Sequence, residues 1–280
     1  MVKVVAIGYG CADVYEHAPV HLFERLERAD LERLVALGLD CRDREETMLV
    51  LHPAWAAEPT LERLELLRGC LETNRMTAQA LPHAPLAGAV LVSLIAAAAP
   101  ILADPGRLLG AIPALGRQLL ELTWLSRVSG LERPNPTVWQ HLLSYWPPSR
   151  FVAASWPRPA VRRITRKRSE PRLPSLPAGT VGLALTDVRG DRGWIETAVR
   201  PALGHPELRE RAPSASARAW WGAPRFMELV AFPLDLVATV RIAVAAAQSG
   251  RCAWCRQDAP VGRCPFCGDT RTDERTAVAA

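Results

Sequence analysis

Hydrophobic and polar positions follow regular periods in the first quarter of the chain. Residues 2–8 form a β-branched run that ends in glycine, tyrosine and glycine, which predicts a buried strand entering a loop. Apolar side chains then recur near helical spacing over residues 22–37, and this period predicts helix. A second strand is expected over residues 47–51 and a further helix over residues 59–71. The chain therefore opens with a pattern typical of a βαβ unit.

A long uncharged stretch follows, with no Asp, Glu, Lys or Arg from residue 76 to residue 103. Small and branched apolar side chains at 86–99 predict a helix that is buried on every side or that spans a membrane. A second apolar helix is expected over residues 108–125, so the two would form a hairpin. Arg117 and Glu121 lie one turn apart in that second helix, which favours a buried hairpin over a membrane-inserted one. The βαβ pattern is not expected to continue here.

The second half of the chain combines a proline-rich segment with further α/β patterns. Nine prolines lie between residues 133 and 178, a density that opposes regular structure and predicts a linker or arm. A strand is expected over residues 181–185 and a helix from near Trp194, whereas residues 212–219 are typical of a loop. Residues 226–248 have the pattern of a long apolar helix. This half is therefore also expected to contain more helix than strand.

Charge changes this picture at one place, the proline-rich segment. The chain carries 34 Lys and Arg against 29 Asp and Glu, a net charge of +5. Seven of these cations gather there within 15 residues: Arg158, Arg162, Arg163, Arg166, Lys167, Arg168 and Arg172. Such a cluster can neutralise phosphates, and aromatic side chains just before it could stack on bases, so a nucleic-acid partner is favoured. An anionic membrane surface, an acidic protein partner and an inert linker are the alternatives.

Four cysteines near the end of the chain carry the most specific chemistry. Two Cys-x-x-Cys pairs are separated by eight residues: Cys252 and Cys255, then Cys264 and Cys267. Each pair places two sulfurs on one side of a tight turn, and four thiolates suit a tetrahedral zinc ion. The segment 251–270 resembles the short zinc-ribbon modules of many bacterial proteins, whose second turn reads Cys-Pro-x-Cys-Gly. The first turn departs from that pattern, with Ala253 where proline is common and Arg256 where glycine is common.

The four cysteines predict a structural metal, not a catalytic one. With all four positions of a Cys₄ site occupied by protein, the ion has no open position at which to activate water. Iron in a rubredoxin-like site uses similar spacing, and a disulfide or redox pair is the remaining alternative. A redox pair works singly at the start of a helix, which is not the context here.

Other motifs are weaker and favour ordinary structural roles. The Gly8-Tyr9-Gly10 turn lacks the third glycine of a dinucleotide fingerprint, because Asp13 stands at that position. His17 and His21 have the spacing of zinc ligands on a helix, but a proline lies between them, so a surface loop is expected. The acidic residues Asp187, Asp191 and Glu196 are expected to cap a helix. Cysteine nucleophiles at Cys11, Cys41 or Cys70 have no partner that spacing identifies.

Together these patterns predict an α/β fold that is mainly helical, with a two-part body and a C-terminal zinc ribbon. The expected parts are a mainly helical α/β domain with the apolar hairpin at residues 1–132, a proline-rich basic linker at 133–178, a small α/β unit with a long C-terminal helix at 179–250, the ribbon at 251–270 and a tail at 271–280.

The function expected from the sequence is binding, with structural Zn²⁺ as cofactor and nucleic acid as partner. The basic arm would contact phosphates, and the ribbon would add a second surface. A membrane-associated scaffold is the first alternative, and an enzyme whose site is not identified is the second. No small-molecule substrate is identified. The start of the sequence lacks a signal-peptide pattern and the cysteines outside the quartet are scattered, so a cytoplasmic location is expected, with membrane association as the alternative.

Overall fold

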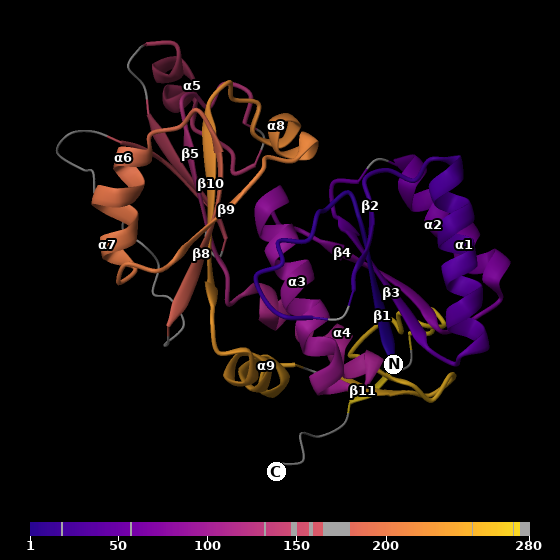
Figure 1. Cartoon of the computed structure of the whole chain (residues 1–280). Coiled ribbons are helices and arrows are strands. Elements are labelled where there is room, and N and C mark those ends of the chain that lie inside the picture. Colours follow the sequence, from indigo (N-terminus) through magenta and orange to yellow (C-terminus); the bar gives the residue numbers. More distant parts are fainter. Residues whose placement is uncertain are drawn as a thin grey trace. The chain divides into compact units, whose positions relative to one another are not determined.

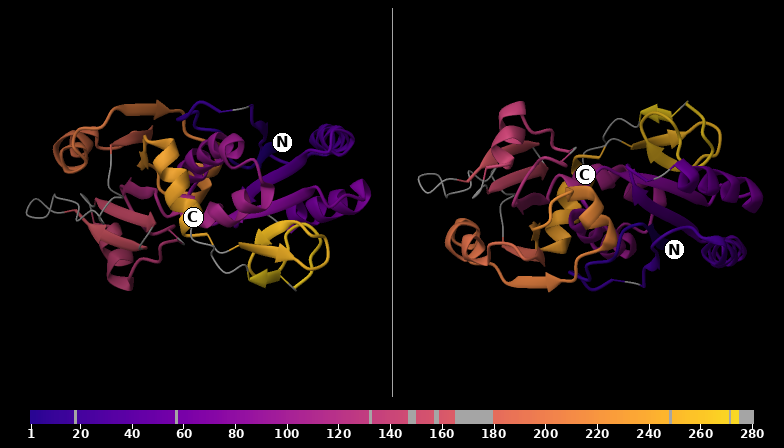
Figure 2. Two further views of the ribbon diagram at one scale, coloured as in Figure 1. Left: turned by 90° about the horizontal axis from the view of Figure 1, so that it is seen from below. Right: turned by 90° about the horizontal axis from the view of Figure 1, so that it is seen from above.

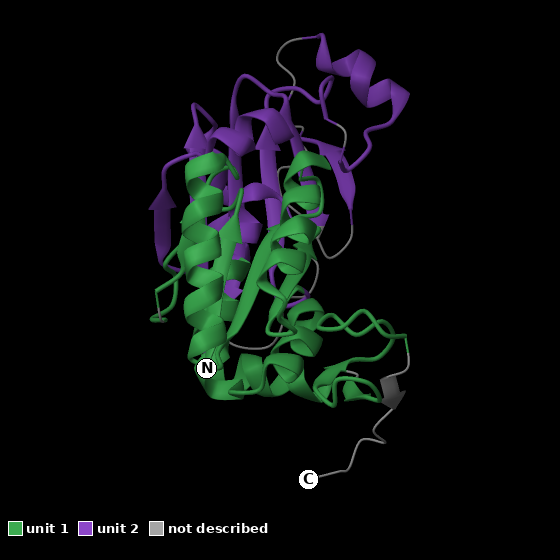
Figure 3. Ribbon diagram, turned by 90° about the vertical axis from the view of Figure 1, so that its right-hand side faces the viewer, with its two compact units in different colours: residues 1–82, 91–116, 236–280 green, residues 83–90, 117–235 purple. Residues whose placement is uncertain are grey.

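The computed structural model describes residues 1–17, 19–56, 58–131, 133–146, 150–156, 159–164, 180–247, 249–270 and 272–274. The chain divides into two compact units, and neither is a continuous stretch of sequence (Figure 3). The first unit contains residues 1–82, 91–116 and 236–280, and the second contains residues 83–90 and 117–235. The helix that follows the fourth strand therefore contributes residues to both.

The first unit is built on a four-stranded parallel sheet. Its strands lie in the order β2-β1-β3-β4 and are β1 (Val2–Ile7), β2 (His21–Phe23), β3 (Thr47–Pro53) and β4 (Met76–Leu81). Every residue of β3 is buried. A strand covered on both faces is apolar at successive positions instead of alternating, so β1 and β3 can be recognised in the sequence as continuous apolar runs.

Helices cover both sides of this parallel sheet. Figure 1 shows α1 (Arg28–Asp43) and α2 (Glu58–Leu71) on one side, and α4 (Pro105–Gly116) with the C-terminal part of α3 (Pro85–Leu102) on the other. Alternate residues of the strands, such as Val5 and Ile7, pack with apolar side chains of α1 and α2 in one core. The period of two along each strand thus assigns neighbouring residues to opposite faces.

The second unit is built on a six-stranded mixed sheet in the order β7-β6-β5-β10-β8-β9, in which only the pair β8–β9 is parallel. The strands are β5 (Leu120–Leu125), β6 (Phe151–Trp156), β7 (Ala160–Arg163), β8 (Val181–Val188), β9 (Leu208–Arg211) and β10 (Phe226–Pro233). The helical elements are α5 (Val138–Ser144), α6 (Arg192–Trp194), the π-helical turn η1 (Ile195–Val199), α7 (Arg200–Ala202) and α8 (Ala215–Trp221).

Each face of the mixed sheet has its own apolar core. On one face, side chains of β5, β8 and β10 pack with Trp194, Ile195 and Val199 of the α6–η1 segment. On the other face, Phe151 and Phe226 pack with Trp221 of α8. The central strands β5 and β10 are therefore buried on both faces, and their sequences contain few polar positions.

The C-terminal segment belongs to the first unit and packs against its helices. It consists of α9 (Leu236–Ala245) and a small antiparallel sheet, β12-β11-β13, formed by β11 (Ser249–Cys252), β12 (Asp258–Pro260) and β13 (Thr272–Glu274). Both views in Figure 2 place this sheet beside α4. The backbone of Gly106 approaches the Asp258 carbonyl so closely that a side chain at residue 106 would overlap it. Arg68 of α2 donates a hydrogen bond to the Phe266 carbonyl.

The prediction of a mainly helical fold is wrong, because three stretches that were not expected to be strands pair into the two main sheets. β4 continues the βαβ pattern that was expected to stop, β5 replaces the end of the second hairpin helix, and β10 replaces the first part of the long helix expected at residues 226–248. The segment expected as a loop at residues 212–219 contains most of α8. Strands β5 and β10 are buried along nearly their whole length, and periodicity alone does not distinguish such strands from buried helix.

The apolar hairpin also differs from its prediction. Helix α3 has the length and mean hydropathy of a membrane-spanning segment, but 83% of its apolar window is buried inside the structure. Its partner α4 ends at Gly116, and Glu121 lies on strand β5 instead of on a helix. This degree of burial is that of a core helix, and it does not support insertion of the hairpin into a bilayer.

The domain boundaries expected from the sequence divide the chain differently from the two units. The expected linker at 133–178 lies within the second unit, and residues 132, 147–149, 157–158 and 165–179 lie outside the described residues. The described part of that segment includes α5, β6 and β7.

Candidate functional site

The carboxyl ends of the parallel strands form one edge of the first unit's sheet. The chain leaves β1 for β2 on one side and later passes from β3 to β4 on the other, so the strand order reverses between β1 and β3. Ligands of open α/β sheets bind outside the carboxyl ends of the strands at such a point. Here Tyr9 follows β1 and Trp55 follows β3, and their rings meet edge to face with centroids 6.1 Å apart. The Tyr9 hydroxyl donates to the Leu81 carbonyl at the end of β4, at 3.1 Å.

The loop between β1 and β2 brings three polar side chains together at this edge. The sulfur of Cys11 lies 3.3 Å from Nε2 of His17, and an Asp13 carboxylate oxygen lies 3.4 Å from the same nitrogen. The loop is fixed to α3 by the Tyr15 N–H, which donates to the hydroxyl of the buried Ser93 at 3.3 Å. His17 was expected in a surface loop; it does lie in a loop, but its side chain is only 9% exposed.

The Cys11 thiol is unsuited to act as a nucleophile. Burial, with a contribution from the nearby Asp13 charge, raises the pKa of Cys11 to about 11. At neutral pH the thiol is therefore protonated, and only the thiolate attacks carbonyl or disulfide substrates. The Asp13 carboxylate also approaches Nε2 of His17, the nitrogen that faces the Cys11 sulfur. In a catalytic triad the carboxylate instead binds the other ring nitrogen, which here is Nδ1. Cysteine-based catalysis thus finds no support in this loop.

A second polar cluster lies inside the second unit, beneath the start of α3. His83, Glu121 and Glu228 are each no more than 3% exposed. Nδ1 of His83 is paired with Glu121, whose other oxygen accepts a hydrogen bond from the Ala84 N–H at 3.4 Å. Glu228 accepts from the Leu86 N–H at 3.1 Å. The two carboxyl groups thus receive backbone donors at a helix N-terminus, where the helix dipole favours negative charge.

The two glutamates come from neighbouring strands, β5 and β10. In the antiparallel register Glu121 is opposite Val230, so Glu228 is displaced by two residues and faces the same side of the sheet. Complete burial raises the pKa of Glu228 to about 7, and the Glu121 charge adds to this effect. The Leu86 N–H and the Trp221 indole offset part of it. A proton is therefore bound more tightly by Glu228 in the folded protein than in the unfolded chain.

We expect Glu228→Gln to remove a pH dependence of folding stability. The folded pKa of about 7 exceeds the ordinary value of 4.5, so the contribution of Glu228 to stability is full below pH 4.5 and is lost as the pH rises through 7, by on the order of 3 kcal/mol. Glutamine keeps the acceptor for Leu86 and cannot ionise. Urea unfolding from pH 5 to pH 8 should show this loss in the wild type and in the control Glu196→Gln, whose side chain is exposed, but not in Glu228→Gln. Parallel curves for all three proteins would contradict the assignment.

The C-terminal quartet has the geometry of a metal centre. All four sulfurs lie within 4.8 Å of one another, and the pairs Cys252–Cys267 and Cys255–Cys264 are each 3.6 Å apart. Sulfur atoms bonded to one tetrahedral zinc ion at about 2.3 Å are about 3.8 Å apart, whereas a disulfide holds them at about 2.0 Å. The backbone N–H groups of Trp254 and Cys255 point to Cys252; burial raises the pKa of that thiol, but the donors outweigh this and the pKa falls to about 7.

The second turn of the quartet repeats the first. Backbone N–H groups of Phe266 and Cys267 point to the sulfur of Cys264, and Gly268 takes the left-handed conformation, φ +81°, that follows such a turn. Cys252 and Cys264 are buried, and Cys255 and Cys267 are half-buried. The four residues therefore fit a tetrahedral ion with thiolate ligands, as their spacing predicts.

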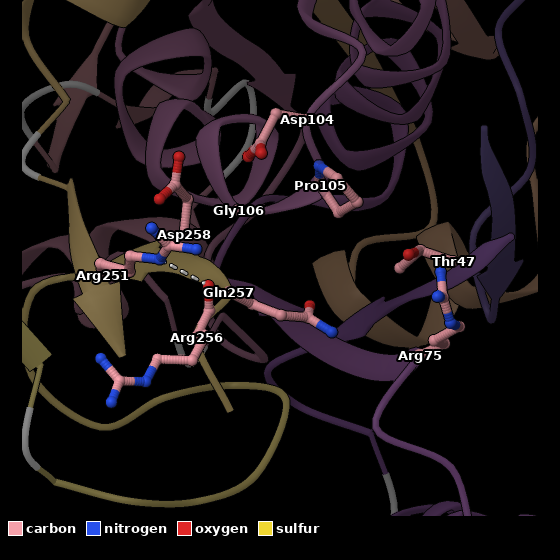
Figure 4. A pocket seen from close by; sticks show the side chains of 9 residues that line it. All are labelled: Thr47, Arg75, Asp104, Pro105, Gly106, Arg251, Arg256, Gln257 and Asp258. Carbon is pink, nitrogen blue, oxygen red and sulfur yellow. Dashed lines mark hydrogen bonds between the residues drawn. The ribbon is translucent and has the colours of Figure 1, made fainter. Parts of the chain in front are cut away.

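A pocket of about 430 Å³ lies where the C-terminal segment meets the start of α4 (Figure 4). Its lining includes three arginines, Arg75, Arg251 and Arg256, and two aspartates, Asp104 and Asp258. Nε of Arg251 donates to the Arg256 carbonyl at 2.9 Å, and Arg75 donates to Glu45. A lining of this charge does not suit an apolar ligand, because the guanidinium and carboxylate groups would lose hydration without compensation.

The predicted nucleic-acid-binding residues lie mostly outside the described residues. Arg162 and Arg163 are exposed at the end of β7, whereas Arg158, Arg166, Lys167, Arg168 and Arg172 are among those that the structure does not describe. The expected capping cluster has a structural role: Asp187 accepts from the Gly190 N–H at 2.8 Å, and Asp191 is the N-cap of the helix that contains Trp194.

Comparison with known proteins identifies the fold. No protein-family model and no curated protein matches the chain. Among solved structures, a DegV family protein from Corynebacterium glutamicum matches with a TM-score of 0.56 at 11% identity, covering 84% of this chain and 98% of that one. A DegV family protein from Thermus thermophilus, described as binding fatty acid, matches with a TM-score of 0.55 at 12% identity over 83% and 99%. A stearic-acid-binding protein from Eubacterium ventriosum matches with a TM-score of 0.56 at 8% identity over 83% and 98%. The chain has the DegV fold.

These matches correct the function expected from the sequence. Proteins described as binding fatty acids match this chain along nearly their whole length, which contradicts the nucleic-acid-binding adaptor and the sequence-based conclusion that no small-molecule substrate is identified. They support neither the membrane scaffold nor the enzyme with an unidentified site. The basic cluster at residues 158–172 does not by itself indicate a nucleic-acid partner, because a net charge in one segment is as typical of a solvated surface as of a binding site.

Proposed function

We propose that this protein binds a long-chain fatty acid. The observation that carries the proposal is the match, over almost their full length, to structures described as fatty-acid-binding. A fold accommodates many functions, so this support is an analogy that the chain's own residues must justify. Those residues lie at the carboxyl edge of the parallel sheet, where ligands of such sheets bind.

The edge between β1 and β3 carries an aromatic pair beside polar groups. Tyr9 is 4% exposed and holds the half-buried Trp55 ring edge to face, so the accessible part of Trp55 is the aromatic surface that we assign to an acyl chain. Backbone at the strand ends supplies donors for a carboxylate. The charged pocket beside α4 lacks such a surface, which is why we place the acyl chain at the sheet edge.

A fatty acid should co-purify with the protein. Organic extraction of freshly purified protein followed by mass spectrometry is expected to release a long-chain acid at up to one equivalent, and the delipidated protein should rebind it saturably. The methyl ester should bind more weakly, because it lacks the carboxylate. Trp55→Ala is expected to weaken binding by about tenfold, on the order of 1–2 kcal/mol, while Trp139→Ala, whose side chain is 74% exposed on α5, should not change it. Absence of acid from the extract together with absence of saturable rebinding would refute the proposal.

We also propose that Cys252, Cys255, Cys264 and Cys267 bind one structural zinc ion. The sulfur separations of 3.6 Å and the paired backbone donors support this. Zinc would crosslink the two Cys-x-x-Cys turns, and no reaction step is assigned to it. A cytoplasmic location follows as part of the proposal, since Cys11, Cys41 and Cys70 are free thiols.

A further inference from the structure

The loop after β1 holds a set of side chains that the fatty-acid proposal does not use. Cys11, Asp13 and His17 each direct one ligand atom to a common point, and these atoms lie within 4.8 Å of one another. The residues fall within seven positions of sequence, but they do not share a regular element, because the loop turns at Asp13 with φ +43°. Such a left-handed turn is uncommon for a residue other than glycine, and it brings the carboxylate back toward the imidazole.

The separations fit coordination of one ion. For zinc bonded to sulfur at about 2.3 Å and to nitrogen and oxygen at about 2.0–2.1 Å, tetrahedral angles give about 3.6 Å between sulfur and nitrogen and about 3.4 Å between nitrogen and oxygen. The corresponding distances are 3.3 Å from Cys11 to His17 and 3.4 Å from His17 to Asp13. Both neighbours approach Nε2 of His17, which is the arrangement of ligands around an ion.

We propose that Cys11, Asp13 and His17 form a binding site for a divalent transition-metal ion, separate from the C-terminal quartet. A thiolate, an imidazole and a carboxylate together favour zinc or cobalt over magnesium and calcium, which prefer oxygen ligands. Three protein ligands leave a fourth position for water or another ligand. The Asp13 side chain is 61% exposed, so the site borders solvent on the side of this ligand.

Contacts around the loop fix the three ligands. Ser93, which is fully buried in α3, accepts from the Tyr15 N–H between Asp13 and His17. Tyr9, two residues before Cys11, is held by its hydrogen bond to Leu81. Neighbours that hold the ligands in place in this way raise the affinity of a metal site. Ser93 is therefore a positioning residue, and Ser93→Ala should weaken metal binding without removing a ligand.

Metal titration of the full chain tests the site. Metal-free protein is titrated with Zn²⁺ against a competing chelator, and with Co²⁺ while the sulfur-to-cobalt charge-transfer band is recorded. We expect Cys11→Ser and His17→Ala each to bind one ion fewer than the wild type, or to bind it at least 100-fold more weakly. Cys70→Ser, which removes an exposed thiol, should behave as the wild type. All of these variants keep the four C-terminal cysteines. The difference in metal stoichiometry or affinity between wild type and variant therefore reports on the Cys11 site alone, whether or not the quartet binds zinc.

Asp13→Asn provides a test that remains valid if the Cys11 and His17 variants fail to fold. Asparagine tolerates the left-handed conformation, and the position is exposed, so the fold should persist while a charged ligand is lost. Weaker metal binding by Asp13→Asn with an unchanged unfolding temperature of the metal-free protein would support the site. Equal metal stoichiometry and affinity in the wild type, Cys11→Ser and Asp13→Asn would overturn the proposal. Removal of the ion from the wild-type site by the weakest competing chelator would also overturn it. Neither result bears on fatty-acid binding, which is measured separately.

Discussion

Cys264→Ser is expected to abolish zinc binding at the C-terminal quartet and to release residues 249–270 from the helices of the first unit. Cys264 is 1% exposed, and a serine hydroxyl is a poor replacement for a thiolate ligand of zinc. A small metal module has too little apolar core to fold without its ion, so the loss of one ligand should unfold the whole segment. Chelation of zinc from the wild type should have the same effect.

The contacts that would be lost connect residues 249–270 to α2 and α4. Release would break the hydrogen bond from Arg68 to the Phe266 carbonyl and would expose the Phe266 ring, now 1% exposed. Exposing one such ring costs about 1.5–3 kcal/mol. The first unit should therefore unfold at a lower temperature, and limited proteolysis should cut within residues 249–270.

Zinc content per chain, proteolysis and thermal unfolding measure these effects. Cys70→Ser should match the wild type, because that thiol is exposed on α2. Gly106→Ala separates docking from metal binding: its methyl group would overlap the Asp258 carbonyl, so stability should fall while zinc stays bound. Gly69→Ala has open space and lies within α2, so it should be neutral or stabilising by about 0.5–1 kcal/mol. Full zinc content in Cys264→Ser, or unchanged stability after zinc removal, would contradict the proposal.

His83→Ala is expected to destabilise the second unit by about 3–5 kcal/mol. The substitution leaves the Glu121 carboxylate buried at 3% exposure without its imidazole partner, and a single unpaired charge in a core is far more costly than the pair. The hydrogen bond from the Ala84 N–H remains, but its 3.4 Å length makes it a weak replacement. Urea unfolding at pH 7 measures the change.

A second substitution separates loss of the pair from loss of packing. His83→Ala combined with Glu121→Gln should recover much of the stability, because glutamine carries no charge and can still accept from Ala84. His205→Asn is the matched control: the side chain is exposed, and asparagine tolerates its φ of +57°. If the single and double variants were equally unstable, the histidine would act through packing alone.

Part of the fold could be predicted from local pattern. Strands β1 and β3 were expected because β-branched apolar runs end at turn residues, and α2 was expected from its helical period. The same reasoning failed for β5 and β10. Both lie at the centre of the mixed sheet with helices on both faces, so every position is apolar or buried, and the sequence resembles a buried helix.

The candidate sites differ in the same way. The cysteine quartet could be predicted because Cys-x-x-Cys spacing fixes sulfur positions within single turns, although its metal stays a prediction. Glu121 and Glu228 gave one available signal, a carboxylate inside an otherwise apolar run, which in a folded protein requires a partner. That partner is the start of α3 with His83, which lies 38 residues from Glu121 in the sequence. Local sequence spacing cannot predict a contact over this separation.

By itself, the sequence determined some local elements, among them β1, β3 and α2, and the clustering of the four C-terminal cysteines, because these depend on neighbours a few residues away. The tertiary structure decided which apolar runs are strands, how β5, β8 and β10 pair, and which polar groups meet at the start of α3 and around His17. Strand pairing and side-chain convergence are set by contacts distant in the chain and by the turns between them. A local pattern of apolar residues favours burial, and burial alone does not specify the partner.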